Sequence, residues 1–277
     1  MNLQDLKNLI WKPNRPLILK LPPPWEISPL IGPIVSKLMS GSQITLWDRF
    51  KLWLHGWEVK DINYGGAFYV LLSEKEASHG GCGAFLARKN LVSTRVLMAP
   101  HSFFDEKTGD LALSMFLSNP RFQAVFFNTL HRYKHEDGSK EEREPPSANH
   151  ADACHWQDHP LAIMSAMCFK DFGMELVQLH GFKKLDGYPD AIISSGASVP
   201  NALRDAILPA MKQAFPEYSI MGYPEEVNHH GGTQNLQGSA SRNLGGMFAH
   251  IELADTFRDD LSVSETLRDS LGVVLGA

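Results

Sequence analysis

The stretch STRVLMAPHSFFDEKTGDLALSMF, residues 93–116, decides the fold because its character changes twice within a short length. It begins with an apolar run, STRVLMAP, that is typical of a buried strand. Residues 108–116 then predict a helix, with Thr108 as a suitable N-cap and Asp110 near the first turn. Another apolar run, QAVFFNT, predicts the next strand.

The same alternation of strands and helices continues along the chain. Further strands are predicted at GGAFYVLLSE, MELVQLHGF, DAIISSG and FAHIELA. Helices are predicted at residues 152–169, 202–214 and 255–271. Pro160 marks either a break or the first turn of a second segment, and Pro209 interrupts the middle helix. The pattern predicts an α/β domain over residues 66–277, with a central, mostly parallel mixed sheet flanked by helices.

Residues 1–65 have a different composition and predict an N-terminal cover segment or small appendage. A proline-rich stretch, LKLPPPWEISPLIGP, precedes the tryptophan-containing run LWDRFKLWLHGWEV. Scattered aromatic side chains usually belong to a core, so we expect these to pack on the main domain rather than form a peptide-binding surface.

Composition excludes several classes of function. The chain has 277 residues, 43% of them hydrophobic, and a formal net charge of -5, which gives no electrostatic basis for nucleic-acid binding. Its three cysteines, Cys82, Cys154 and Cys168, form no CxxC pair, which favours a reducing compartment. No signal-peptide pattern or membrane-length apolar run is visible, so we expect a cytoplasmic protein without a membrane partner. The oligomeric state is not readable from the sequence.

Histidines and a carboxylate follow or end three predicted strands. His101 comes after STRVLMAP, His180 ends MELVQLH, and His250 and Glu252 lie in FAHIELA. The carboxyl ends of parallel strands are where functional groups gather in such sheets. A lone histidine there is more often structural than a metal ligand, and a buried Glu252 could instead pair with an arginine.

Asp105 and Glu106 add acidic groups to the first of these positions. They follow His101 by four and five residues, and a short loop could fold both ends of that segment onto one ion. A catalytic zinc ion takes three such protein ligands and leaves one position for water.

The order of these motifs resembles the zinc carboxypeptidase superfamily, particularly its succinylglutamate desuccinylase and aspartoacylase branch. VQLHGF is similar to the strand that carries the second zinc histidine, and GGTQNLQG to a segment after the third ligand. APHS, ADACHWQDH and AHIELADTFRDDL also resemble the N-formylglutamate amidohydrolases. The similarity consists of short motifs spread over residues 96–261.

The resemblance implies a zinc site and a general base. Zinc would be held by His101, Asp105 and His180, and Glu252 would serve as the base. The family places its acid three residues after the first histidine, where this chain has Phe104. Glu106 and His155 therefore remain alternatives to Asp105 as the third ligand.

The resemblance also suggests residues that contact the substrate. Asn128 and Arg132 in FFNTLHRY are similar to an Asn-Arg pair that grips a substrate oxygen or carboxylate, although Arg132 could instead pair with a glutamate of the next loop. Further candidates for substrate contact, by their positions in these motifs, are Asp152, His155, Asn235 and Arg258.

The alternatives for these candidates are structural. Asp152 and His155 would lie on one side of a helix, which could be a polar face over the mouth of the site. Arg258 could form a salt bridge on a helix surface. The loop NHHGGTQN could be a mobile lid or an ordinary connection.

The sequence therefore predicts a zinc-dependent hydrolase that cleaves an amide bond in a small N-acyl amino acid or at a peptide end. GxSxG and HExxH motifs are absent, which argues against a serine mechanism of the α/β-hydrolase type and against that class of zinc protease. The alternative is a non-catalytic relative that binds an anionic ligand or a protein partner in the same pocket.

Overall fold

The predicted apolar runs form the centre of one mixed sheet in the computed structural model, which describes residues 1–11, 24–75, 81, 83–133 and 151–277. The strands are β1 (Trp57–Tyr64), β2 (Ala67–Glu74), β3 (Ala84–Arg88), β4 (Arg95–Ala99), β5 (Ala124–Phe127), β6 (Glu175–Phe182), β7 (Ala191–Ser194), β8 (Ile220–Gly222) and β9 (Met247–Ala254). The helices are α1 (Leu3–Trp11), α2 (Pro24–Ser40), α3 (Leu46–Leu54), α4 (Thr108–Ser118), α5 (Pro160–Phe172), α6 (Ala202–Ala214), α7 (Leu236–Leu244), α8 (Asp255–Val263) and α9 (Glu265–Gly276).

The strand order places the predicted functional strands together at the centre of the sheet. It is β1-β2-β3-β5-β4-β6-β9-β7-β8, with β5, β4, β6 and β9 mutually parallel. The pairs β1/β2, β2/β3, β3/β5 and β7/β9 are antiparallel, whereas β7 and β8 are parallel. The α/β class with a mixed sheet flanked by helices is confirmed, and its parallel centre carries the carboxyl ends of β4, β6 and β9 at one edge.

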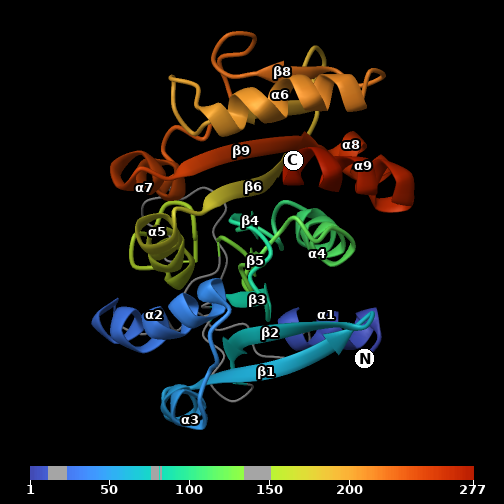
Figure 1. Cartoon of the computed structure of the whole chain (residues 1–277). Coiled ribbons are helices and arrows are strands. Elements are labelled where there is room, and N and C mark those ends of the chain that lie inside the picture. Colours follow the sequence, from blue (N-terminus) through green and yellow to red (C-terminus); the bar gives the residue numbers. More distant parts are fainter. Residues whose placement is uncertain (12–23, 76–80, 82, 134–150) are drawn as a thin grey trace.

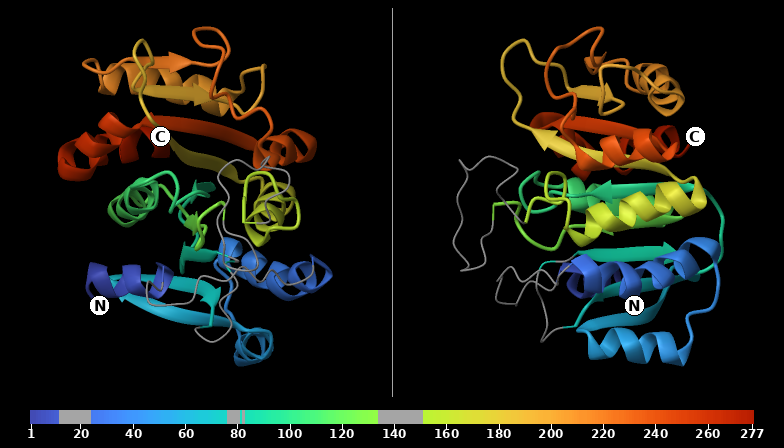
Figure 2. Two further views of the ribbon diagram at one scale, coloured as in Figure 1. Left: turned by 180° about the vertical axis from the view of Figure 1, so that it is seen from behind. Right: turned by 90° about the vertical axis from the view of Figure 1, so that its left-hand side faces the viewer.

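Helices cover both faces of this sheet (Figure 1). One core cluster packs α1, α4, α6, α8 and α9 on one face, and a second packs α2, α5 and α7 on the other. The side view in Figure 2 shows α2 and α5 crossing in front of the strands. Side chains at alternate positions of each central strand supply the two clusters, as the two-residue period of a strand requires. None of the helices that the structure describes combines the length and hydropathy needed to cross a bilayer.

Two helix predictions are corrected at their ends. The helix over residues 255–271 is two helices, because Ser264 ends α8 and its side chain caps Leu267 at the start of α9. The N-cap of α4 is Lys107, in the left-handed region with φ 71°, whereas the Thr108 hydroxyl donates to the Asp105 carbonyl at 2.7 Å. The first turn of α4 is thereby hydrogen-bonded to the polar loop that precedes it.

Prolines inside the predicted helices have two different outcomes. Residues 152–159 form turns rather than a helix, and α5 begins at Pro160, where the missing N–H removes no hydrogen bond. The imidazole of His159 caps this start by accepting from the Leu161 N–H at 3.1 Å. Pro209, by contrast, lies inside an uninterrupted α6.

The N-terminal segment consists of α1, α2, α3 and the edge strand β1, which pairs with β2 along its whole length. The expectation that its aromatic residues pack on the core is wrong for α3. Trp47 and Trp53 are 61% and 55% exposed, and Leu52 is the residue of this helix that is buried. Whether residues 1–65 form a separate appendage stays a prediction.

Candidate functional site

A row of four polar side chains lies at the carboxyl ends of β6 and β9. Gln178 pairs in register with His250, and His180 pairs with Glu252, so all four point to the same face of the sheet. Earlier in the same row the residues are apolar, as at Phe248, and belong to the core under α5 and α7. The change from apolar to polar along one row forms a buried polar site at the edge of that core.

The loop after β4 folds a carboxylate back onto its own histidine. The backbone N–H of Asp105 donates to the His101 carbonyl at 2.8 Å, closing a turn. Oδ2 of Asp105 then lies 3.4 Å from Nδ1 of His101 and 3.1 Å from Nδ1 of His180. All three side chains are buried, whereas the neighbouring Glu106 is exposed. The structure thus brings together His101, Asp105 and His180, and places Glu106 outside the cluster.

Asp152, in the turns before α5, holds the other side of the His101 ring. Its Oδ1 lies 3.0 Å from Nε2 of His101 and accepts from the Cys154 N–H at 3.0 Å. Its Oδ2 accepts from Nη2 of Arg132. A carboxylate can only accept, so Nε2 of His101 carries a proton in this pair and Nδ1 faces Asp105.

The His180 ring is oriented by a chain of amides that begins on the backbone of α7. Asn235 caps α7, and its Oδ1 accepts from the N–H of Gln237 at 2.9 Å and of Gly238 at 3.3 Å. Its Nδ2 is therefore a donor, and the partner is Oε1 of Gln178. That same oxygen lies 2.9 Å from Nε2 of His180. Because an amide oxygen only accepts, Gln178 favours a proton on Nε2 of His180. The Nδ1 lone pair and the Asp105 carboxylate then face each other, an arrangement that a cation between them would stabilise.

A second anchor fixes the Gln178 amide in the same orientation. Nε2 of Gln178 lies 3.3 Å from Oε1 of Gln237, whose own Nε2 donates to the Ala153 carbonyl at 2.8 Å. One end of the network is fixed by backbone N–H groups, which can only donate, and the other by a backbone carbonyl, which can only accept. This side of the network therefore favours the His180 tautomer with the proton on Nε2.

Asp105 lies at a suitable distance from each of the two histidines to share a metal ion with it. In a tetrahedral zinc site with bonds of about 2.0–2.2 Å, neighbouring nitrogen and oxygen ligands lie about 3.3–3.6 Å apart. The separations of Asp105 Oδ2 from the two Nδ1 atoms, 3.4 and 3.1 Å, are close to that span. Histidine ligands generally donate their other ring N–H to a carboxylate or carbonyl group, as both rings do here.

Cys154 is a functional candidate that the sequence reasoning missed. Its Sγ lies 3.8 Å from Nε2 of His180, and the donor atoms of His101, Cys154 and His180 all lie within 4.8 Å of one another. Thiolate sulfur and imidazole nitrogen are common zinc ligands, so this set is a candidate beside the one that contains Asp105. The available signal was its place inside the histidine-rich segment ADACHWQDH.

Protonation states differ among the side chains of the cluster. Burial lowers the pKa of His180 to about 4, with the nearby His250 adding to the effect, so the ring is neutral at pH 7. Burial acts to raise the pKa of Asp105, but its contacts with the rings of His101 and His180 hold the pKa below its ordinary value. Burial likewise raises the pKa of the Cys154 thiol.

His101 differs from His180 because it lies between carboxylates. Burial acts to lower its pKa, yet the electrostatic interactions with Cys154 and Asp152 and the contact with Asp105 raise the pKa well above its usual value. A metal ion at Nδ1 would have to compete with a proton there.

A cavity of about 480 Å³ opens beside the cluster, and both predicted catalytic residues line it. Glu252 accepts a hydrogen bond from His250 at 3.2 Å. Burial would raise the pKa of Glu252, but this bond and the charges of both nearby histidines lower it, so the carboxylate is ionised at neutral pH. Arg132 reaches the cavity from the loop after β5, where its Nη1 lies 3.3 Å from Nδ1 of His101.

Arg258 also lines the cavity and is buried rather than part of a salt bridge on a helix surface. Its Nη1 donates to the carbonyls of Leu253 and Phe182, and its Nε has no hydrogen-bond partner among the described residues. Gly181 makes room for it, because a Cβ there would lie 2.1 Å from Nη1. The chain therefore places a guanidinium against β6 at the mouth of the polar cluster.

Other predicted contact residues lie around the cavity rather than in it. Asn128 is fully buried and donates to the Ala151 carbonyl at 2.9 Å. Nδ1 of His155 lies 3.1 Å from Oδ2 of Asp152. With Asn235 bound to Gln178, these side chains support the cluster from behind, and their predicted contacts with substrate stay untested.

Comparisons with known proteins give structural likenesses alone. No protein-family model matches the sequence, and no curated protein has significant similarity to it. A bacteriophage poly-gamma-glutamate hydrolase is similar in structure, with a TM-score of 0.41, 12% identity, and coverage of 65% of this chain and 81% of that one. The N-formylglutamate amidohydrolase of Ralstonia eutropha JMP134 has a TM-score of 0.42, 10% identity, and coverage of 66% and 91%.

A metallo-carboxypeptidase from Burkholderia cenocepacia is also similar, with a TM-score of 0.38, 11% identity, and coverage of 90% of this chain and 65% of that one. The similar structures thus include the kinds of hydrolase that the sequence motifs resemble. At these scores the likeness carries no argument about chemistry, and the function is argued from the cluster itself.

Proposed function

We propose that the protein is a metal-dependent hydrolase, with zinc as the metal, that cleaves an amide bond in a small N-acyl amino acid or at a peptide end. The observation that carries the proposal is the orientation of the two histidine rings. Asp152 and Gln178 occupy their Nε2 sides, so both Nδ1 atoms face the Asp105 carboxylate. Two imidazole nitrogens and one carboxylate oxygen are the donor set of many catalytic zinc sites.

The metal would be held by His101, Asp105 and His180. When bound, it supplies Lewis-acid activation of the scissile carbonyl and of a water molecule. Glu252 is ionised and lies in register with His180, which supports a role in taking the proton from water and returning it to the leaving amine. His250 holds the Glu252 carboxylate through its Nε2 and orients it for this role.

Arginines would bind the negative charges of the substrate. Arg132 is tied to Asp152 beside His101, a position suited to stabilising charge that develops on the carbonyl oxygen. Arg258 has backbone partners rather than a carboxylate, which leaves its charge available to a substrate carboxylate in the cavity. These two cations support an acylated amino acid or a peptide end as the substrate class.

The test combines metal analysis with a matched pair of variants. Purified protein from a zinc-supplemented culture should contain close to one equivalent of zinc and lose it in the His180→Ala variant. A panel of N-acyl amino acids and short peptides should be hydrolysed by the parent and by Glu217→Gln, whose side chain is exposed and does not line the cavity. Glu252→Gln should bind zinc equally well yet lose at least about a hundredfold in kcat.

Zinc below about a tenth of an equivalent would overturn the metal assignment. Full activity of Glu252→Gln would remove Glu252 as the base. Zinc binding without turnover of any panel member would favour the alternative, a relative that binds an anionic ligand in the same cavity.

A further inference from the structure

Helix α3 presents an apolar stripe to solvent. Its large hydrophobic residues with high exposed fractions are Leu46 (86%), Trp47 (61%), Phe50 (48%), Trp53 (55%) and Leu54 (59%). At 100° per residue these five positions fall within one face about 120° wide. The opposite side holds Leu52, which is buried, and Asp48, which closes a capping box with Thr45. The stripe is the outward side of a helix that is firmly attached by its other side.

Cations border this stripe on both sides. On the helical wheel, Arg49 lies beyond one edge and Lys51 beyond the other. The Lys51 ammonium lies 5.3 Å from the centre of the Trp47 ring, and Lys75 lies 3.8 Å from that of Trp53. Aromatic residues at the centre with lysine and arginine around them are the composition of helices that lie in a membrane interface.

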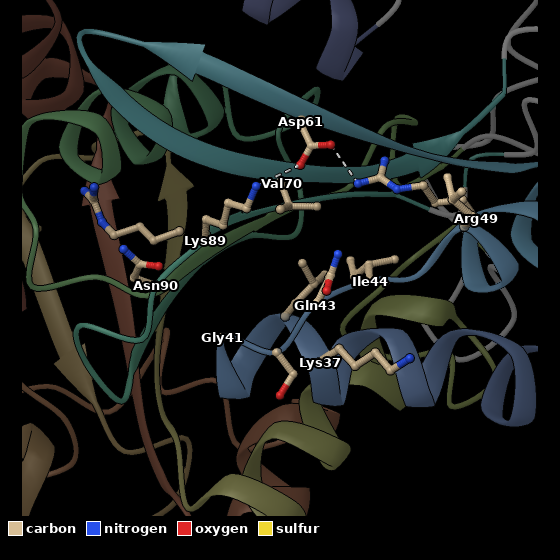
Figure 3. A pocket seen from close by; sticks show the side chains of 13 residues that line it. Lys37, Gly41, Gln43, Ile44, Arg49, Asp61, Val70, Lys89 and Asn90 are labelled. Atoms are coloured by element: carbon tan, nitrogen blue, oxygen red, sulfur yellow. Dashed lines mark hydrogen bonds and ion pairs between the residues drawn. The ribbon is translucent and has the colours of Figure 1, made fainter.

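A cavity of about 450 Å³ continues the positive charge beside the start of α3 (Figure 3). Figure 3 shows Arg49 and Lys89 reaching Asp61 from two sides, with Lys37 of α2 across the cavity. Arg88 also lines it. Lys37 pairs with Asp48, and Arg49 and Lys89 share Asp61, so the four basic residues exceed the two acidic partners. This surplus lies on a chain whose net charge is -5.

We infer that α3 and this cavity form a docking surface for an anionic lipid bilayer, with the apolar stripe entering the interface and the cations facing lipid phosphates. Charge decides between occupants. A second copy that packed α3 against α3 would bring the exposed Lys51 of each chain together, whereas an anionic surface satisfies this cation. This peripheral contact goes beyond the proposed hydrolase function and differs from the sequence expectation that the protein has no membrane partner.

The experiment is vesicle flotation of the full chain. Vesicles of phosphatidylcholine containing roughly one third phosphatidylglycerol should carry the parent protein upward, and pure phosphatidylcholine should carry much less. The Trp47→Ser/Trp53→Ser variant should partition at least about tenfold more weakly. Lys51→Glu should lose binding to the anionic vesicles, as should the parent at about 0.5 M salt.

The matched control is Val263→Ser, which removes an 84% exposed apolar side chain from the end of α8 and should bind vesicles as the parent does. Circular dichroism melts should agree among all variants, because the exchanged side chains are exposed. The proposal is overturned by absent vesicle binding, or by equal binding of the double tryptophan variant. A concentration-dependent dimer in sedimentation velocity that the same double variant abolishes would assign the stripe to a second copy and would also overturn it.

Discussion

Replacing Asn235 with aspartate tests whether the amide network controls the metal site. The change substitutes one oxygen for one NH₂ group. Aspartate is as good an N-cap as asparagine and a negative charge suits a helix N-terminus, so α7 should keep its cap. The donor to Gln178 Oε1 is lost, however, and two oxygens then face each other. Turning the Gln178 amide over removes that repulsion, but it presents an NH₂ group to Nε2 of His180.

That reversal moves the His180 proton to Nδ1, the atom that faces Asp105. Metal binding must then work against the preferred tautomer. Loss of a partner that orients a histidine ligand typically weakens metal affinity 10- to 100-fold, which corresponds to about 1.4–2.8 kcal/mol. We expect a zinc Kd for Asn235→Asp that is raised by this factor at about pH 8, where the new carboxylate is ionised.

The assay is competition for zinc between the metal-free protein and a chromophoric chelator. The matched control is Asn201→Asp, because Asn201 caps α6 through Oδ1 and donates Nδ2 to the Phe248 carbonyl at 2.8 Å, away from the ring nitrogens. Both variants lose an amide donor, from a buried side chain in Asn235 and from a half-buried one in Asn201. Melting temperatures measured alongside separate stability from affinity. Equal zinc affinity in Asn235→Asp and Asn201→Asp would refute the tautomer argument. The ¹⁵N shifts of His180 in the metal-free protein give a second readout of the same proton.

Three further predictions concern the pH dependence of zinc affinity, the N-terminal cap of α3 and the room that Gly181 leaves for a guanidinium. Zinc affinity should fall as pH drops, by up to about tenfold per unit, because a proton competes at His101, whose pKa is raised; the check is the Kd at several pH values. Asp48→Asn should cost about 1 kcal/mol in urea unfolding at neutral pH, since burial is outweighed by hydrogen bonds with Lys37 and Thr45 that lower the Asp48 pKa to about 2. A depressed pKa contributes stability above the unfolded value of 3.8, so the difference should vanish as pH falls from there towards 2. Gly181→Ala should displace the guanidinium it contacts and raise KM for acidic substrates, whereas Gly272→Ala in α9, with ordinary contacts of 3.5 Å, should leave KM unchanged.

Much of the fold follows from the spacing of apolar residues and from the polar segments that separate the apolar runs. The apolar runs that predicted strands became β2, β4, β5, β6, β7 and β9. They are apolar throughout because the sheet has a hydrophobic core cluster on each of its two faces. Helix ends were less predictable. Lys107 takes a left-handed conformation that its residue type does not signal, since the loop must return Asp105 to His101.

Orientation of an amphipathic helix is a harder problem than its existence. The apolar spacing of α3 is the same whether the stripe faces the core or solvent. Contacts from other elements decide it here: Arg49 donates to Asp61 and to the Val59 carbonyl of β1, and Lys37 of α2 pairs with Asp48. These bonds turn the polar side of α3 inward and leave Trp47 outside. No local rule in the sequence contains that information.

In the candidate site, too, some features follow from residue types and positions in the sequence, whereas others depend on contacts between distant residues. Strand-end positions were enough to predict that His101 and His180 would meet, because parallel strands end at one edge of the sheet. They could not reveal which ring nitrogen would face Asp105. That choice depends on Asp152 from the turns before α5 and on Asn235 acting through Gln178, groups far apart in the sequence. A metal site of this kind is therefore encoded less by its ligands than by the hydrogen-bonding character of the residues behind them, which is why Asn235 should matter to zinc without touching it.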